Sequence, residues 1–294
     1  MNHTMNRLTL FVLTLGLLLY GCSKPAPVEL QQDAGDAILE VTSVVQGDSS
    51  LGLTTVDSSA VLPEDQGRFA CLLQVAHVRF DAGGVVDTTL AFAHVIVEDR
   101  NRPVQIGNRI IGYFGMNLGL VYISANQNAS LMIPVSHRPG RRDTAGVEYY
   151  RDMTDITLPY RPTTRYTFRA FPDSLDIFPT SIETPEDINV LFPRGGSVIR
   201  RDRDLALAWT GYGTLSFVIS ELSNGRARPI FRVKVRNNLQ HAVLSKKILQ
   251  LLPVHDYVLT FMLENRKEGI TTASFSGRVL VQTASVYNTY VRLF

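Results

Sequence analysis

The side chains best suited to metal binding or proton transfer are the histidines, and their spacing is unfavourable. Beyond the first 22 residues they are His77, His94, His137, His241 and His255, and no two lie two or four residues apart. A metal site would need ligands from different strands, and His77 and His94, both in strand-like runs, are the pair that could meet in this way. We expect structural histidines instead, with no metal and no cofactor, and we assign no acid–base pair.

A nucleophilic serine is the second candidate for chemistry. The segment Gly47-Asp48-Ser49 follows two valines and resembles the nucleophile block of the GDS-type esterases. That resemblance implies a later Gly-x-Asn-Asp and an Asp-x-x-His near the C-terminus, and neither occurs. A Gly-x-Ser-x-Gly motif is also absent. We interpret the segment as a turn and expect the protein not to be an enzyme.

Basic side chains form the third group of candidates. Apolar and basic residues alternate from Phe231 onward, which predicts a strand with one core face and one basic face. The basic residues expected along this hairpin are Arg226, Arg228, Arg232, Lys234 and Arg236. They could bind an anionic ligand, or they could serve only to prevent edge-to-edge pairing of strands.

The N-terminal stretch indicates where these residues would act. Arg7 precedes Leu8–Leu19, twelve residues without a charge, which is the pattern of a secretory signal. A membrane-spanning helix needs roughly 20 apolar residues, so a transmembrane anchor is the weaker interpretation.

The end of this stretch, Leu19-Tyr20-Gly21-Cys22, resembles the bacterial lipobox. The resemblance implies that residues 1–21 are removed and that Cys22 carries acyl chains such as palmitate, which anchor the mature protein in the cell envelope. Tyr20 departs from the small residue usual at that position. Ser23 resembles the outer-membrane sorting pattern of enterobacterial lipoproteins, which implies the outer membrane, at its periplasmic side or surface. The alternative is an ordinary cleaved signal with an incidental Cys22.

Cys71 is the only other cysteine in the chain. A lipidated Cys22 cannot pair with it, so we expect no disulfide within the mature chain. Cys71 lies in an apolar, strand-like run and should be a buried thiol that packs as a small hydrophobe. A reactive thiol would need basic, partly exposed surroundings.

Length, charge and proline positions predict two modules after the signal and a proline-containing tether, residues 22–35. Residues 23–184 carry 13 basic and 19 acidic side chains, whereas residues 185–294 carry 15 and 8. We expect an N-terminal module, residues 36–184, with a last strand within 176–183, and a C-terminal module, residues 185–294. The opposite charges would let the modules dock on each other or let the outer one meet an anionic partner.

Hydrophobic periodicity predicts an all-β chain. Apolar residues alternate with others in short runs between turn residues, and helical periodicity nowhere exceeds about two turns. The apolar run 90–98 should be a strand buried on both faces that ends at a polar turn, residues 99–103. Leu205, Leu207 and Trp209 indicate another strand with a core face.

Two stretches resemble the tyrosine corner of fibronectin type III domains, in which the tyrosine that opens strand F bonds back to the chain upstream. They are residues 158–170, which include Tyr166, and residues 251–261, which include Pro253 and Tyr257. Trp209 resembles the strand B tryptophan of such domains. The resemblance implies two antiparallel Ig/fibronectin III-like β-sandwich domains in which these four residues are structural.

These observations favour a membrane-anchored envelope lipoprotein whose β-sandwich modules act as a scaffold, spacer or assembly partner. The alternative is a ligand-binding or adhesive lipoprotein that recognises an anionic glycan or a protein through its basic C-terminal module. We expect the partners to be a membrane, through the N-terminal lipid, and another envelope protein or an anionic glycan. Nucleic acid is not expected, because an exported protein rarely meets it.

Overall fold

Strands make up nearly all the regular structure of the protein. The computed structural model describes residues 28–30, 39–43, 69–83, 88–106, 108–137, 145–171, 181–235, 239–271 and 277–294. Within these ranges the one helix is α2, Lys246–Leu251, and the other elements are β-strands. The prediction of an all-β chain is confirmed. No helix in the described ranges is both long and apolar enough to cross a bilayer.

One large sheet runs through the whole molecule and contains twelve of the described strands. Its neighbours follow the order β1-β2-β16-β15-β18-β19-β3-β4-β5-β9-β8, and β13 pairs with β19. The strands in this order are Val28–Leu30, Leu39–Ser43, Arg226–Val235, Thr214–Ser223, Asp256–Thr271, Gly277–Leu293, Cys71–Asp81, Thr88–Ile106, Arg109–Gly115, Ala145–Asp152 and Ile133–His137, with Ser197–Ile199 as β13.

Two smaller sheets cover the two ends of the large one. The first, hereafter the four-stranded sheet, has the order β11-β10-β6-β7, and the second has the order β12-β14-β17. The strands of the four-stranded sheet are Ser181–Glu183, Arg165–Phe171, Leu120–Ala125 and Asn128–Leu131. Those of the three-stranded sheet are Asn189–Phe192, Leu205–Thr210 and His241–Leu244.

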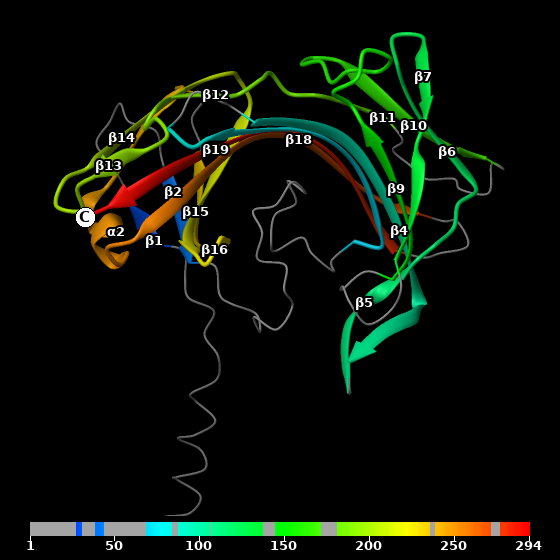
Figure 1. The fold of residues 1–294 in the computed structure, drawn as a ribbon, viewed down its shortest axis with the longest axis horizontal. Coiled ribbons are helices and arrows are strands. Elements are labelled where there is room, and N and C mark those ends of the chain that lie inside the picture. The colour runs from blue at the N-terminus through cyan, green and yellow to red at the C-terminus, as the bar shows by residue number, and fades with distance from the viewer. Residues whose placement is uncertain are drawn as a thin grey trace, which may run out of the picture.

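The molecule has the shape of an arch with a lobe at each end. Strands β18 and β19 curve across the top of Figure 1 from one end to the other, and the two small sheets lie at opposite ends. We call the end with β12, β14 and β17 the C-terminal lobe and the end with the four-stranded sheet the N-terminal lobe. Each lobe is a sandwich of a small sheet on one end of the large sheet.

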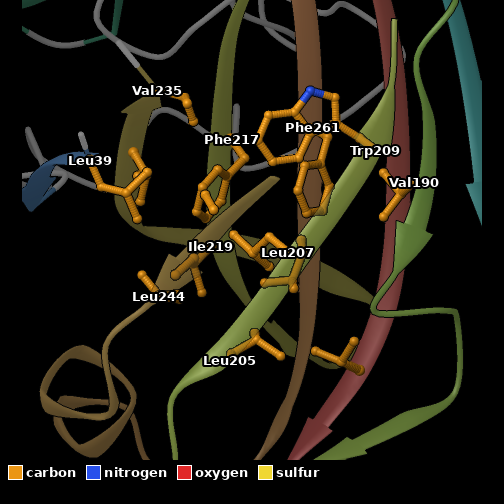
Figure 2. Close-up of a cluster of buried hydrophobic side chains, with 14 of the residues drawn as sticks. Leu39, Val190, Leu205, Leu207, Trp209, Phe217, Ile219, Val235, Leu244 and Phe261 are labelled. Atoms are coloured by element: carbon orange, nitrogen blue, oxygen red, sulfur yellow. The ribbon is translucent and has the colours of Figure 1, made fainter. Parts of the chain in front are cut away.

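The core of the C-terminal lobe follows from the alternation of apolar residues in its strands. Leu205, Leu207 and Trp209 point from β14 toward Phe217 of β15 and Phe261 of β18 (Figure 2). The rings of Phe217 and Phe261 stack with centroids 5.3 Å apart. All five side chains are buried, so the alternate residues of this strand form a core face as the sequence predicts.

A second core fills the N-terminal lobe, and β19 contributes to both. Val279 and Val281 lie in the N-terminal core, whereas Val291 and Leu293 of the same strand lie in the C-terminal core. Strand β19 also pairs in parallel with β3 over eleven residues, from Cys71 to Asp81. The two lobes are therefore connected by hydrogen-bonded strands as well as by the chain between them.

Two segments differ from the sequence interpretation. Strand β4 does not end at residue 99. It continues to Ile106 through a bulge between Asp99 and Pro103, because the residues between them can leave the ladder where proline lacks a donor. Val28–Leu30, predicted as part of the tether, pair with β2, and β2 pairs with β16 of the C-terminal lobe. The predicted boundary near residue 184 stays a prediction, and β11, Ser181–Glu183, lies within the strand expected there.

Candidate functional site

Of the four residues predicted to be structural, Tyr166, Trp209 and Tyr257 are buried and Pro253 is exposed. Tyr257 lies at the start of β18 and its hydroxyl donates to the carbonyl of Pro253 at 3.0 Å. The hydroxyl of Tyr166, near the start of β10, donates to the carbonyl of Pro159 at 2.8 Å and accepts from the amide of Arg161 at 2.9 Å. Both upstream hydrogen bonds expected at the corners are present, and Trp209 is buried.

The two histidines that could have met across strands lie on opposite faces of the large sheet. His94 of β4 is in register with Gln74 of β3, three residues from His77, so alternation along β3 places the two imidazoles on different faces. His94 Nε2 lies 3.1 Å from Glu148 Oε2, whereas His77 bonds Asp187. The described residues contain no group of three or more ligands that could hold a metal ion.

A polar cluster at the junction between the lobes surrounds Asp187, in the connection from β11 to β12. His77 Nδ1 lies 2.9 Å from Asp187 Oδ1, and Arg79 donates to Oδ2 at 3.3 Å. The Ser285 hydroxyl donates to Oδ1 at 3.2 Å and accepts from the amide of Ile188 at 3.0 Å. These bonds fasten the connection between the lobes to strands β3 and β19.

This cluster contains serine, histidine and aspartate, but their arrangement does not activate the serine. An activated serine donates its proton to a histidine base, whereas Ser285 donates to the carboxylate of Asp187. Partial burial alone would raise the pKa of Asp187, but the hydrogen bond and charge of His77, the charge of Arg79 and the hydrogen bond from Ser285 hold that pKa below its usual value. The geometry suits an ionised carboxylate that accepts bonds from both lobes, which is a structural role.

The predicted basic hairpin forms, but Arg232 does not lie on an exposed face of it. Strands β15 and β16 pair from Ser223 and Arg226 onward, and Arg228 and Lys234 are exposed. Arg232 is only 9% exposed, and burial holds the pKa of its guanidinium below the usual value, against the opposing charges of Glu264 and Glu40. The prediction that Arg232 belongs to an exposed stripe is wrong, because the second face of the large sheet is also buried at this point.

Several predicted positions cannot be placed. Cys22, the Gly47-Asp48-Ser49 segment and Arg236 lie outside the described residues, as does the side chain of Arg226. Cys71 is completely buried, and burial raises the pKa of its thiol. Its surroundings are those of a small hydrophobic residue in the core, as the sequence predicts.

A hollow lined by polar, charged and aromatic side chains lies on the outer face of the four-stranded sheet. We call it the sheet groove. Its volume is about 520 Å³, within the range of small-molecule sites. The side chains and turn residues that line it come from β6, β7 and β10 and are Tyr122, Ser124, Ala125, Asn126, Gln127, Ala129, Arg165, Thr167, Arg169 and Phe171.

Strand alternation explains which side chains reach this groove. On β10 the residues Tyr166 and Phe168 enter the N-terminal core, so Arg165, Thr167 and Arg169 face outward. Arg169 is in register with Tyr122 of β6, and Thr167 with Ser124. The groove therefore presents a row of hydroxyl groups between Arg165 and the pair formed by Arg169 and Tyr122.

Both arginines of the groove are exposed. No carboxylate of the described residues forms an ion pair with Arg165 or Arg169, although Glu183 is in register with Arg165. The rings of Tyr122 and Phe171 meet edge to face, with centroids 6.0 Å apart. Phe171 also lines a second hollow, of about 680 Å³, beside Leu120, Pro134 and Val147.

Sequence reasoning missed the sheet groove. The alternation of Arg165, Thr167 and Arg169 with apolar residues was a usable signal, because it marks one polar face of a strand. The contribution of β6 and β7 depends on the register with β10, which the sequence does not show. A comparison of the chain with protein-family models and with curated proteins finds no match to either.

Proposed function

We propose that this chain is a non-enzymatic lipoprotein of the bacterial cell envelope, anchored through Cys22 and built as a stiff two-lobed scaffold. The proposal takes the compartment from the Leu8–Cys22 pattern and the scaffold role from the fold. The length of a lipid-anchored protein limits how far from the membrane it can contact other envelope components. A long and stiff protein would therefore suit a scaffold role.

The observation that carries the scaffold role is the continuity of the large sheet. Strand β19 contributes side chains to both cores, pairs with β18 along sixteen residues and pairs with β3 over eleven. To bend one lobe relative to the other would break these ladders, whereas two sandwiches on a flexible linker would move freely. The Asp187 cluster adds side-chain bonds at the same place.

The proposal includes that the two lobes are fibronectin III-like or Ig-like domains. In the C-terminal lobe a three-stranded sheet, β12-β14-β17, packs on β16-β15-β18-β19, and the corner tyrosine begins β18. This order, with a buried tryptophan on β14, is the arrangement that the resemblance implies.

The anchor is tested by Cys22→Ser. We expect the wild-type protein in the membrane fraction after extraction with high salt, and the variant released in soluble, folded form. Metabolic labelling with a palmitate analogue should mark the wild type and not the variant. Retention of the variant in the membrane, or a variant that cannot fold, would contradict lipid anchoring at Cys22.

A further inference from the structure

The sheet groove lies on a part of the molecule that the scaffold role does not use. It is built mostly from exposed and half-buried side chains on three paired strands and the turn between two of them, and its residues have no structural role comparable to that of the buried corner tyrosines. We propose that the sheet groove binds an acidic oligosaccharide, that is, a chain of sugar rings that carries carboxylates. This inference goes beyond the proposed scaffold function and does not depend on the lipid anchor.

The charge of the groove indicates an anionic ligand with more than one charge. Arg165 and Arg169 lie four residues apart on the same face of β10, a spacing of about 13 Å along a strand. Each guanidinium can hold a carboxylate with two parallel hydrogen bonds. An extended ligand with spaced charges can pair with both arginines at once when their side chains follow the strand spacing.

The aromatic and hydroxyl groups indicate a sugar. Tyr122 lies beside Arg169, and its ring and that of Phe171 offer apolar surface for the C–H faces of sugar rings. Thr167 and Ser124 lie between the two arginines. The Ser124 hydroxyl donates to the carbonyl of Thr167 at 3.4 Å and can accept a hydrogen bond from a ligand, whereas the Thr167 hydroxyl can accept and donate. An oligosaccharide binds through hydrogen bonds to its hydroxyl groups and through contact of its ring faces with aromatic side chains, and the groove offers both.

The hairpin between β6 and β7 closes one side of the groove. Asn126 and Gln127 both have positive φ, 49° and 71°, which makes a tight two-residue turn that matches the twist of the strands. Their side chains are exposed at the groove. Two amides on a rigid turn can recognise sugar hydroxyls with little loss of freedom on binding.

An acidic peptide is the competing ligand, and the location of the groove disfavours it. An extended peptide usually binds by adding a strand to a sheet edge, where backbone groups are free. The groove lies on the face of the sheet, and the backbone groups of β6 and β10 already pair with each other. A ligand in the groove meets side chains only, which suits a molecule whose recognition does not require backbone pairing.

The test is calorimetric titration of the full-length protein, in detergent micelles, with trigalacturonate and with neutral maltotriose. We expect binding of trigalacturonate that weakens as salt is raised, and no comparable binding of maltotriose. Arg169→Gln and Tyr122→Ser should each weaken the binding of trigalacturonate by about tenfold or more, because each removes a group that contacts the ligand. Both side chains lie on the surface of the sheet, and unchanged thermal unfolding would show that the variants fold.

The matched control is Arg228→Gln, which removes one exposed arginine from β16, outside the groove. Binding by this variant should equal that of the wild type. The proposal is overturned if trigalacturonate does not bind at millimolar concentration, if maltotriose or a pentaglutamate peptide binds as tightly, or if Arg228→Gln weakens binding as much as Arg169→Gln.

Discussion

At the scale of residues, the hydroxyl group of each corner tyrosine connects a strand to the segment before it. Tyr166 and Tyr257 are completely buried, yet each hydroxyl reaches a backbone carbonyl upstream, that of Pro159 or Pro253. A buried hydroxyl without a hydrogen-bond partner would destabilise the folded state. The bond to the carbonyl avoids this cost, and it also holds the segment before the strand against the strand's first residues. The aromatic ring meanwhile packs in the core.

Removal of one of these hydroxyl groups should have a small, measurable effect. Tyr257→Phe keeps the ring but loses the bond to Pro253, and we expect the free energy of unfolding to fall by about 1 kcal/mol. Chemical denaturation measures the change. Tyr212→Phe is the control, because Tyr212 is exposed and should tolerate the change; equal stability of Tyr257→Phe and wild type would argue against a stabilising corner.

Glu98 of β4 is a carboxyl group whose pKa is shifted toward neutral pH. Burial raises its pKa to about 7, with Arg100 acting to lower it and Glu148 acting to raise it further. The side chain is 18% exposed and its carboxylate lies 3.0 Å from Arg100. The folded protein therefore holds a proton on Glu98 at pH values where the unfolded chain has lost it.

This shift predicts that stability falls as pH rises. A carboxyl with a raised folded pKa gives stability below its unfolded pKa and loses it as pH increases toward about 7. Glu98→Gln should remove that decrease, on the order of 1–3 kcal/mol in the free energy of unfolding. Denaturation at pH 5 and pH 8 measures it. An unchanged difference between the two pH values in the variant would show that Glu98 is not the group responsible.

At the scale of elements, the turn between β6 and β7 shows a local conflict between sequence and backbone. A turn with positive φ at both central residues favours Asn-Gly, but this chain has Asn126 followed by Gln127 at φ 71°. A non-glycine residue in the left-handed region costs about 1–2 kcal/mol. The position of the glutamine at the edge of the sheet groove offers a reason to keep it.

Gln127→Gly should therefore stabilise the protein while it removes an amide from the groove. We expect the free energy of unfolding to increase by about 1 kcal/mol, as measured by chemical denaturation. The control is Gln250→Gly in helix α2, where glycine should instead destabilise by about 1 kcal/mol. A loss of stability in Gln127→Gly would mean that the side chain makes contacts that outweigh the backbone strain.

The sequence predicts where strands lie better than it predicts which strands pair with each other. The alternation of Leu205, Leu207 and Trp209 and the two tyrosine corners depend on residues close in sequence, and the structure has the strand and both hydrogen bonds. The parallel pairing of β19 with β3 joins residues about 200 positions apart. No local pattern reports such a contact, so the shared sheet could not be foreseen from the sequence.

The prediction of an exposed basic stripe is wrong at Arg232 for a related reason. The alternation around Arg232 correctly identifies the face that enters the core, where Val233 is buried. It does not reveal that the opposite face is also buried, together with Val218, Met262 and Val286 of the large sheet. The exposed arginines that remain together, Arg165 and Arg169, lie in the other lobe.

At the scale of the whole molecule, one large sheet contributes side chains to two cores. The lobes share β19. Asp187 holds the connection between them to β3 and β19, and Asp81 of β3 accepts from the amide of Gly195, between β12 and β13, at 2.7 Å. Such an arrangement transmits force from one lobe to the other and leaves little freedom for hinge motion. A lipid anchor at one end and a binding groove on one lobe would then keep a constant separation.

The most direct test of this account is the distance between the lobes in solution. Ile156 of the N-terminal lobe is 95% exposed and Val254 of the C-terminal lobe 60%, so Ile156→Cys and Val254→Cys can carry spin labels in a Cys22→Ser background, where buried Cys71 is the only other cysteine. Pulsed electron paramagnetic resonance should give one narrow distance distribution, because the shared strands allow no independent lobe motion. A broad distribution, or more than one distance, would contradict the stiff two-lobed scaffold.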